Sequence, residues 1–192
     1  KIGNNCNIHS HSVIQNTVVG NNAHVGPFAR LRNNVSVGNN VQIGNFVEIK
    51  NSTIDDNSRT KHLTYLGNAN IGKSVNIGAG TITCNYDGVN KNKTTIEDNV
   101  FIGSNNTLIA PIVIKRGAYT AGGSTINEDV PENSLAIGRA KQQCKKNYSN
   151  KLLNQSKEKG NSSKSKKTKK KSEENQSSFF KAATKTTTVI SD

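Results

Sequence analysis

The residue best suited to proton transfer is His62, which lies in the segment RTKHLTYLG (residues 59–67). Imidazole is the usual general base near neutral pH. A lone histidine in a loop is more often inert, so the residue type alone does not establish a role. The other histidines, His9, His11 and His24, are unevenly spaced in regular sequence, whereas zinc needs convergent ligands. The sequence therefore predicts no histidine-based metal site.

A second candidate is the pair Arg32 and Lys50, which are 18 residues apart. If three six-residue units form one coil, these cations stack on one face at about 4.8 Å and repel each other. Arg30 and Glu48 have the same spacing. The cations are then either exposed, with Glu48 and Arg30 as a cross-strand ion pair, or they form a phosphate site. Spacing alone does not decide between these two interpretations.

A six-residue repeat must position these side chains. Aliphatic residues recur at this interval, and a second small or aliphatic column follows four residues after the first. A fixed short period is typical of stacked parallel β-helix coils, and alternation places both columns on the inner face. The first column contains Val13, Val19, Val25, Leu31, Val37, Ile43 and Ile49, then Ile71 and Ile77, then Ile96, Ile102, Leu108, Ile114, Thr120 and Ile126; the second contains Ala23, Ala29, Val35, Val41 and Val47. The period does not fix handedness, and the general rule for parallel crossovers is right-handed.

The period slips twice, between Ile49 and Ile71 and between Ile77 and Ile96. The first interval contains His62. The second contains the turn sequence NYDG (residues 85–88) and two lysines, so a loop is expected to project there. Loops on rigid scaffolds are where sites are usually built.

The net charge of +13 is unevenly distributed along the 192 residues. Residues 1–140 contain 12 Lys and Arg against 9 Asp and Glu, whereas residues 141–192 contain 14 Lys against 4 acidic residues. We therefore expect a folded domain over 1–140 and a Lys-rich, mostly disordered tail over 141–192, with a short helix possible only at 148–158.

Composition also limits the setting of the chain. The three cysteines form no CxxC pair, which favours a reducing, intracellular environment. No apolar run of about 20 residues is present, so no membrane span is expected. The chain has no Met and starts inside a repeat, which reads as a fragment of a longer protein.

Several motifs together resemble one family: GPFARLR (26–32), IGNFVEIKN (43–51), KHLTYLGNANIGKSVNIGAGTITCNYDGVNKNKT (61–94) and DVPENSL (129–135). The family is the acetyltransferase domain of the bacterial bifunctional N-acetylglucosamine-1-phosphate uridyltransferase/glucosamine-1-phosphate N-acetyltransferase. The resemblance covers roughly residues 1–140. It implies an all-β, left-handed parallel β-helix, a cytoplasmic homotrimer with active sites between subunits, and no uridyltransferase domain or Mg²⁺ site in this chain.

The resemblance also implies an activity, the transfer of acetyl from acetyl-CoA to the amine of glucosamine 1-phosphate. The product feeds UDP-N-acetylglucosamine synthesis for peptidoglycan and related envelope polymers. His62 would be the base and Glu48 would orient it. The implied sugar-phosphate contacts are Arg32, Lys50, Tyr65 and Asn76; the implied acetyl-CoA contacts are Ala79, Asn85, Tyr86, Ser104, Gly122 and Arg139. The family usually has Ala where this chain has Gly122.

Two alternatives remain open from the sequence. The first is another hexapeptide-repeat acyltransferase acting on a different amine or hydroxyl. The second is a non-catalytic β-helix trimer that serves as a scaffold. The Lys-rich tail could attract nucleic acid or anionic lipid non-specifically, but a solvated extension is the simpler interpretation, and no specific nucleic-acid partner is expected.

Overall fold

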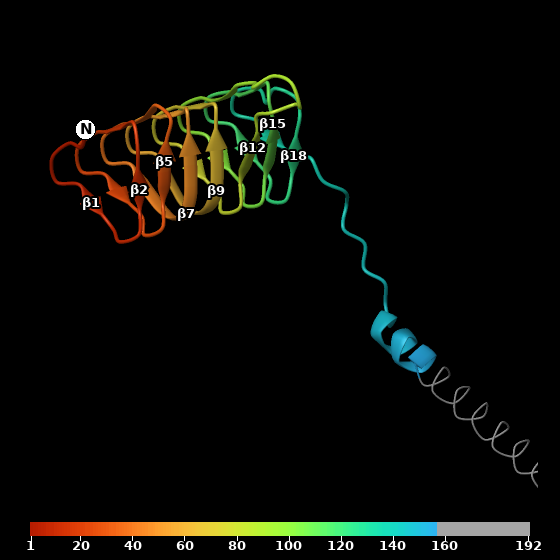
Figure 1. Ribbon diagram of the computed structural model, residues 1–192. Helices are drawn as coiled ribbons and strands as arrows, with labels where there is room; N and C mark the ends of the chain where they lie inside the picture. Colours follow the sequence, from red (N-terminus) through yellow and green to blue (C-terminus); the bar gives the residue numbers. More distant parts are fainter. Residues whose placement is uncertain (157–192) are drawn as a thin grey trace, which may run out of the picture. The chain divides into compact units, whose positions relative to one another are not determined.

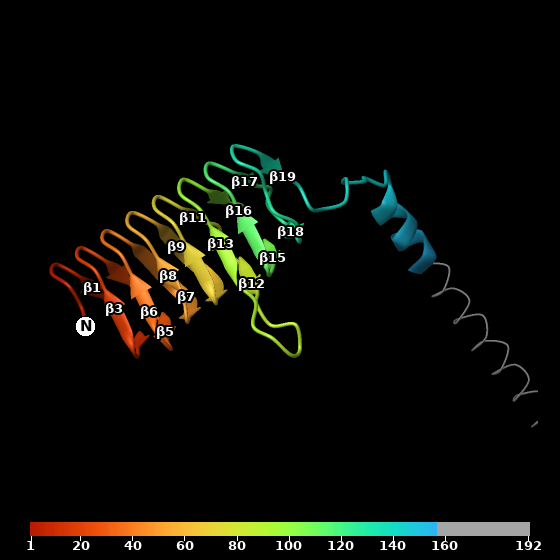
Figure 2. The ribbon, with the colours of Figure 1, turned by 90° about the horizontal axis from the view of Figure 1, so that it is seen from above.

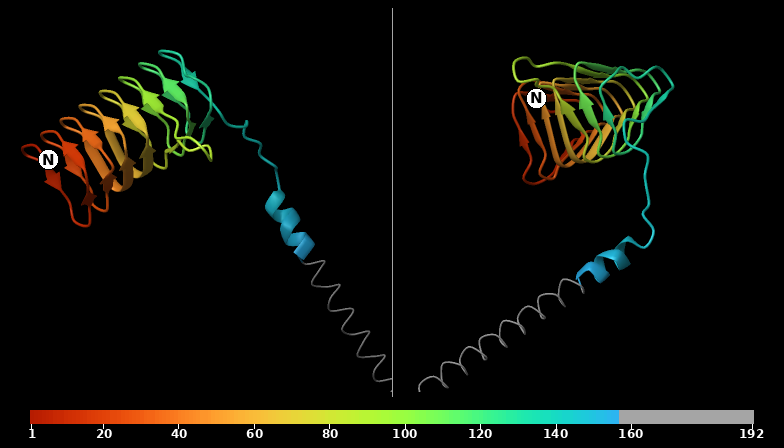
Figure 3. Two further views of the ribbon diagram at one scale, coloured as in Figure 1. Left: turned by 45° about the horizontal axis from the view of Figure 1, so that its top comes forward. Right: turned by 90° about the vertical axis from the view of Figure 1, so that its right-hand side faces the viewer.

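The computed structural model describes residues 1–156, which divide into two compact units, one over 1–140 and one beginning at Lys141. The first unit is a left-handed parallel β-helix whose short strands stack coil upon coil (Figures 1 and 3). The second contains a helix over residues 148–156, within the expected 148–158. Most of the tail predicted to be disordered lies at 157–192, outside the described residues.

The strands of the described residues fall on three faces of the helix (Figures 1 and 2). They are β1 (Asn7–Ile8), β2 (Val13–Ile14), β3 (Thr17–Val19), β4 (His24–Val25), β5 (Arg30–Arg32), β6 (Val35–Val37), β7 (Gln42–Lys50), β8 (Thr53–Ile54), β9 (Arg59–Gly67), β10 (Ala69–Ile71), β11 (Asn76–Ile77), β12 (Ile82–Cys84), β13 (Thr94–Ile96), β14 (Phe101–Ile102), β15 (Thr107–Ile109), β16 (Ile112–Ile114), β17 (Tyr119–Thr120), β18 (Thr125–Ile126) and β19 (Leu135–Ala136).

Each face is a parallel ladder between successive coils. The first face runs β1-β4-β7-β9-β11-β14-β17-β19, and the third runs β3-β6-β8-β10-β13-β16. The second face contains β2, β5, the second halves of β7 and β9, and then β12, β15 and β18. Strands β7 and β9 are nine residues long because each continues across the corner between the first two faces.

Both predicted inward columns are confirmed, with one correction. Their aliphatic members are buried in a single core cluster, apart from Val13, and Thr120 is buried as well. Val13 is exposed, and Ile14 packs on the core in its place. The next member of the first column, Val19, is five positions after Ile14 and not six, so the strict six-residue count selected the wrong residue in the first coil.

The first predicted slip of the period is present, and it lies at two coil edges of 17-residue coils. Residues 59–67 form strand β9, not a loop, and the inward column passes through Ile54, Thr60 and Leu66. Two coil edges are one residue short, and Thr60 lacks the aliphatic character that would have revealed the repeat. His62 therefore lies on a strand that is hydrogen-bonded to β7.

The second predicted interruption is a loop, as expected. Residues 85–93 leave the coil after β12 and return through an antiparallel bridge between Tyr86 and Lys91 (Figure 2). Asp87 closes the turn by accepting the backbone N–H groups of Asn90 and Val89 at 2.6 and 2.8 Å. These hydrogen bonds, with the bond from Asn90 first, lower the pKa of the Asp87 carboxyl.

Candidate functional site

The outer surface of the second face contains two columns of side chains that alternate with the core. One column contains Arg30, Glu48, Tyr65 and Ile82 in register. The other contains Arg32, Lys50 and Gly67 in register, with Cys84 two residues beyond Ile82 on the next strand. The predicted stacking of Arg32 on Lys50 is confirmed.

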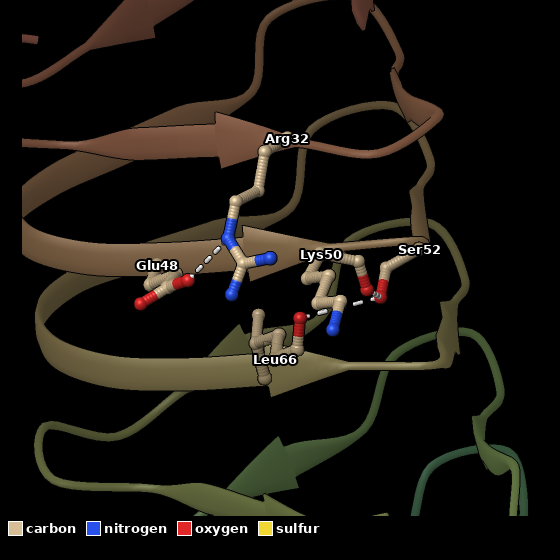
Figure 4. Close-up of polar contacts among 5 residues, drawn as sticks. All are labelled: Arg32, Glu48, Lys50, Ser52 and Leu66. Carbon is tan, nitrogen blue, oxygen red and sulfur yellow. Dashed lines mark hydrogen bonds and ion pairs between the residues drawn. The ribbon is translucent and has the colours of Figure 1, made fainter. Parts of the chain in front are cut away.

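Glu48 forms an ion pair with Arg32, whereas the interpretation of the cations as exposed pairs Glu48 with Arg30. The Arg32 Nε atom donates to Glu48 Oε1 at 2.6 Å, and both side chains are partly buried (Figure 4). Arg30 is directly opposite Glu48 in the ladder, but Glu48 bonds to its diagonal neighbour Arg32. Long side chains can span such diagonal positions on a sheet. The pairing fixes the Arg32 guanidinium beside Lys50.

Lys50 lies in a strongly positive environment. The positive charges of Lys91, from the projecting loop, and then of Arg32 lower the pKa of the Lys50 ammonium; Glu48 offsets this only in part. At the end of the same strand, the Ser52 hydroxyl lies 2.8 Å from the Lys50 carbonyl and 3.3 Å from the Leu66 carbonyl, which fixes the backbone (Figure 4). Clustered cations that disfavour one another are the arrangement expected of an anion site.

Tyr65 completes this cluster. Burial and then the negative charge of Glu48 raise the pKa of its phenol, so it remains a hydrogen-bond donor at neutral pH. Its ring extends over Gly67, where any Cβ atom would overlap the phenol oxygen. The absence of a side chain at Gly67 therefore leaves the space that the Tyr65 hydroxyl occupies.

His62 is oriented by Asn45, a residue that the sequence analysis missed. The two are opposite each other in the β7–β9 ladder, and His62 Nδ1 donates to Asn45 Oδ1 at 2.9 Å. Because an amide oxygen can only accept, Nδ1 carries the proton in this bond, and in the neutral imidazole Nε2 is then the acceptor that a general base requires. Glu48, the expected orienting residue, is three positions further along β7 and is bonded to Arg32. The two-residue alternation predicts neighbours within one face, so it does not identify a partner at the corner between two faces.

Four of the predicted site residues share one corner of the helix. Backbone hydrogen bonds connect this corner from coil to coil: Gly80 N–H to Leu63 O, Asn105 N–H to Ala79 O, and Gly123 N–H to Ser104 O. The corner column accordingly contains His62, Ala79, Ser104 and Gly122. Three coil spacings of about 4.8 Å make it ~14 Å long. An added Cβ at Gly122 would lie 3.5 Å from Ser104 O, which is ordinary contact, so the family's usual Ala fits here.

The remaining predicted residues lie elsewhere on the single chain. Asn76 is on the first face, in register with Arg59 and Phe101. Asn85 and Tyr86 follow β12 at the far corner of the second face, where Asn85 Nδ2 donates to Asn68 Oδ1 at 2.7 Å. Five residues of β9 separate this corner from His62, which is ~16 Å along a strand. Arg139 is exposed after β19. One chain therefore does not bring Asn76, Asn85 and His62 together.

An open cavity of about 490 Å³ borders His62 on the N-terminal side. Its lining includes Asn45, Phe46, Phe28 and Lys61. Next to it, His11, Phe28 and Phe46 stack with ring centroids 4.8 and 5.4 Å apart. Both phenylalanines are exposed on the chain. Stacked, solvent-facing aromatic rings beside a cavity are typical of an interaction surface.

Within residues 1–156, no group of three or more His, Cys, Asp and Glu side chains could hold a metal ion. The same residues contain no helix of the length and hydropathy needed to cross a bilayer.

Comparison with known proteins gives one matching family model and several similar proteins. The family model of the GMPPB C-terminal domain matches residues 13–116. The chain is 56% identical over 148 residues to the bifunctional protein GlmU of Thermosipho melanesiensis, a match that covers 77% of this chain and 33% of the relative. It is 53% identical over 142 residues to that of Thermosipho africanus (74% and 31%) and 55% identical over 141 residues to that of Acinetobacter baumannii (73% and 31%). The chain spans about a third of the length of these curated relatives.

Proposed function

The chain belongs to the family of the GMPPB C-terminal domain and its resemblance to the acetyltransferase domain of GlmU is confirmed; we propose that it transfers acetyl from acetyl-CoA to the amine of glucosamine 1-phosphate. Two features on or next to strand β9 carry this proposal. The first half of β9 holds an oriented base, His62, and its last residue, Gly67, is in register with Lys50 of the anion site.

The phosphate of the substrate would be bound by Arg32, Lys50 and Lys91. A phosphate dianion neutralises the mutual repulsion that lowers the Lys50 pKa. Arg32 is held in place by Glu48, so little side-chain freedom is lost on binding. The Tyr65 phenol, which remains protonated, is placed between this site and His62 and would donate to a sugar oxygen.

Acetyl transfer would then proceed at His62. Nε2 of His62 accepts a proton from the substrate amine while the amine nitrogen forms a bond to the thioester carbonyl carbon. The carbon–sulfur bond breaks, and coenzyme A leaves as the thiolate, which takes up a proton. Asn45 accepts the Nδ1–H before and after this transfer, so the proton is exchanged at Nε2. The expected role of Glu48 is accordingly revised: it positions Arg32 for the phosphate.

Acetyl-CoA would extend along the corner column, past Ala79, Ser104 and Gly122, with its thioester at His62. The absence of large side chains along this corner supports the placement, because an extended chain can approach the backbone closely. Arg139 would meet the coenzyme's phosphates. Asn85 and Tyr86 would line the thioester and stabilise the developing oxyanion.

The last assignment requires more than one chain. Asn85 and His62 are at opposite ends of the second face, and Asn76 is on another face. Their separation supports a homotrimer in which neighbouring subunits complete each site. The exposed aromatic stack of His11, Phe28 and Phe46 supplies an apolar surface for such contact.

The direct test is thiol release from acetyl-CoA by the purified chain with glucosamine 1-phosphate. We expect turnover in the wild type and a loss of about 10²–10⁴-fold in His62→Ala, which is the usual contribution of a general base. His62 is exposed, so the variant should fold and assemble normally. Turnover with other amino sugars but not with glucosamine 1-phosphate would favour the other hexapeptide acyltransferases. No turnover by an assembled trimer with any of them would favour the scaffold.

A further inference from the structure

At the corner that contains His62, the size of the side chains changes from one side of that coil to the other. One residue per coil adopts a left-handed backbone at this corner, and these residues are large and mostly apolar up to Leu63 and are glycine or asparagine from Gly80 on. In order, with their φ angles, they are His11 (58°), Phe28 (56°), Phe46 (55°), Leu63 (49°), Gly80 (76°), Asn105 (54°) and Gly123 (71°). Leu63 is therefore the last large residue before the column of small ones begins.

Leu63 continues the run of large side chains at this position, after Phe28 and Phe46. Left-handed backbone favours Gly and Asn, and a branched apolar side chain is strained there. The side chain of Leu63 is also 61% exposed, so burial in its own chain does not compensate for the strain. A strained and exposed leucine beside a candidate base is best explained by a contact made outside the core of the chain.

The position of Leu63 indicates what that contact is. It directly follows His62, and the Gly80 N–H bonds to its carbonyl at 3.1 Å, so it is next to the end of the small-residue column. On the N-terminal side of His62 lies the open cavity of about 490 Å³, which His62, Phe28 and Phe46 line; Leu63 is outside this lining and lies opposite Phe46 in the β7–β9 ladder. An acyl chain longer than acetyl could extend into this space unless a side chain blocks the path.

We propose that Leu63 sets acyl-chain length by closing the small-residue column at His62, so that acetyl fits and longer acyl groups do not. This inference rests on the proposed acetyl transfer and on the placement of the thioester at His62. It makes Leu63 a specificity-determining residue that takes no part in proton transfer.

The test compares acetyl-, propionyl- and butyryl-CoA as donors to glucosamine 1-phosphate in wild type, Leu63→Ala and Leu63→Phe, by thiol release. In Leu63→Ala, the ratio of kcat/KM for butyryl-CoA to that for acetyl-CoA should rise about tenfold or more, the usual effect of methylenes admitted to an apolar pocket. In Leu63→Phe, a residue already tolerated at this corner in two other coils, the ratio should stay at or below that of the wild type.

The matched control is Leu135→Ala, which removes an equally exposed leucine (60%) on β19. Its ratio should equal that of the wild type. The proposal is overturned if Leu63→Ala keeps acetyl transfer with a ratio within about twofold of the wild type. It is also overturned if Leu63→Ala forms folded trimers but loses transfer with all three donors, because Leu63 would then be needed for transfer itself. A wild type inactive with acetyl-CoA would instead contradict the proposed function.

Discussion

Replacing Asn45 by Asp should move the pH dependence of acetyl transfer while leaving the fold unchanged. The amide oxygen of Asn45 accepts the Nδ1–H of His62 at 2.9 Å, and a carboxylate at this place would occupy almost the same volume. A neighbouring negative charge favours the imidazolium, so a higher pH is needed to free the base. The acid limb of the kcat/KM profile should therefore shift upward.

The size of the shift follows from the geometry. A carboxylate in hydrogen-bond contact is within about 4 Å of the imidazolium charge, where the Coulomb energy is roughly 1 kcal/mol in water and 4 kcal/mol near a protein surface. Both groups are solvent-accessible, so we take the lower part of this range, about 1.4 kcal/mol, which corresponds to about one pH unit.

The assay is thiol release over a pH series with glucosamine 1-phosphate below its KM. Asn45→Ala should leave the limb in place and lower the plateau by about tenfold, because the ring loses its orientation. The control is Asn40→Asp, which adds the same charge to another exposed amide pair, Asn40 with Asn57 at 3.2 Å. The reasoning is refuted if the limb of Asn45→Asp stays within error of the wild type, or if Asn40→Asp shifts equally.

Three further predictions follow from particular contacts. Lys50→Ala should raise the KM for glucosamine 1-phosphate by about ten- to a hundredfold with little change in kcat, since a charged hydrogen bond to phosphate contributes about 1.5–3 kcal/mol; an unchanged KM in saturation kinetics would argue against the anion site. Gly122→Ala should leave the KM for acetyl-CoA within about threefold of the wild type, because its Cβ meets nothing closer than 3.5 Å, whereas Gly103→Ala, whose Cβ would lie 2.6 Å from a backbone nitrogen, should lower the melting temperature; equal effects in thermal and kinetic assays would refute this contrast. Leu66→Ala, at a fully buried position, should reduce the free energy of unfolding by about 2–5 kcal/mol in denaturant titration, and a loss below about 0.5 kcal/mol would contradict the core assignment.

The fold was largely readable from sequence because its core repeats on a short interval. The positions that misled were those where the interval is one residue short, as after Ile14, or where an inward residue is polar, as at Thr60. Neither feature leaves an aliphatic signature. Because Thr60 is not aliphatic, the aliphatic period is interrupted in the sequence at β9, although the strand is continuous.

The site was predicted less completely, for a geometric reason. Stacking within one face follows from a constant spacing, so Arg32 over Lys50 could be predicted. The diagonal reach of Arg32 to Glu48 depends on side-chain length, and the bond from His62 to Asn45 depends on how β7 and β9 turn the corner. Spacing alone contains neither piece of information.

The most direct test of the shared site is complementation between two inactive variants, His62→Ala and Asn85→Ala. Each is assayed alone, and the two are then co-expressed in equal amounts and purified as mixed trimers. If each site takes His62 from one subunit and Asn85 from its neighbour, about a quarter of the sites in random trimers are native and a similar share of wild-type activity returns. Activity no greater than that of the separate variants, in trimers shown to be mixed, would contradict a site formed between subunits.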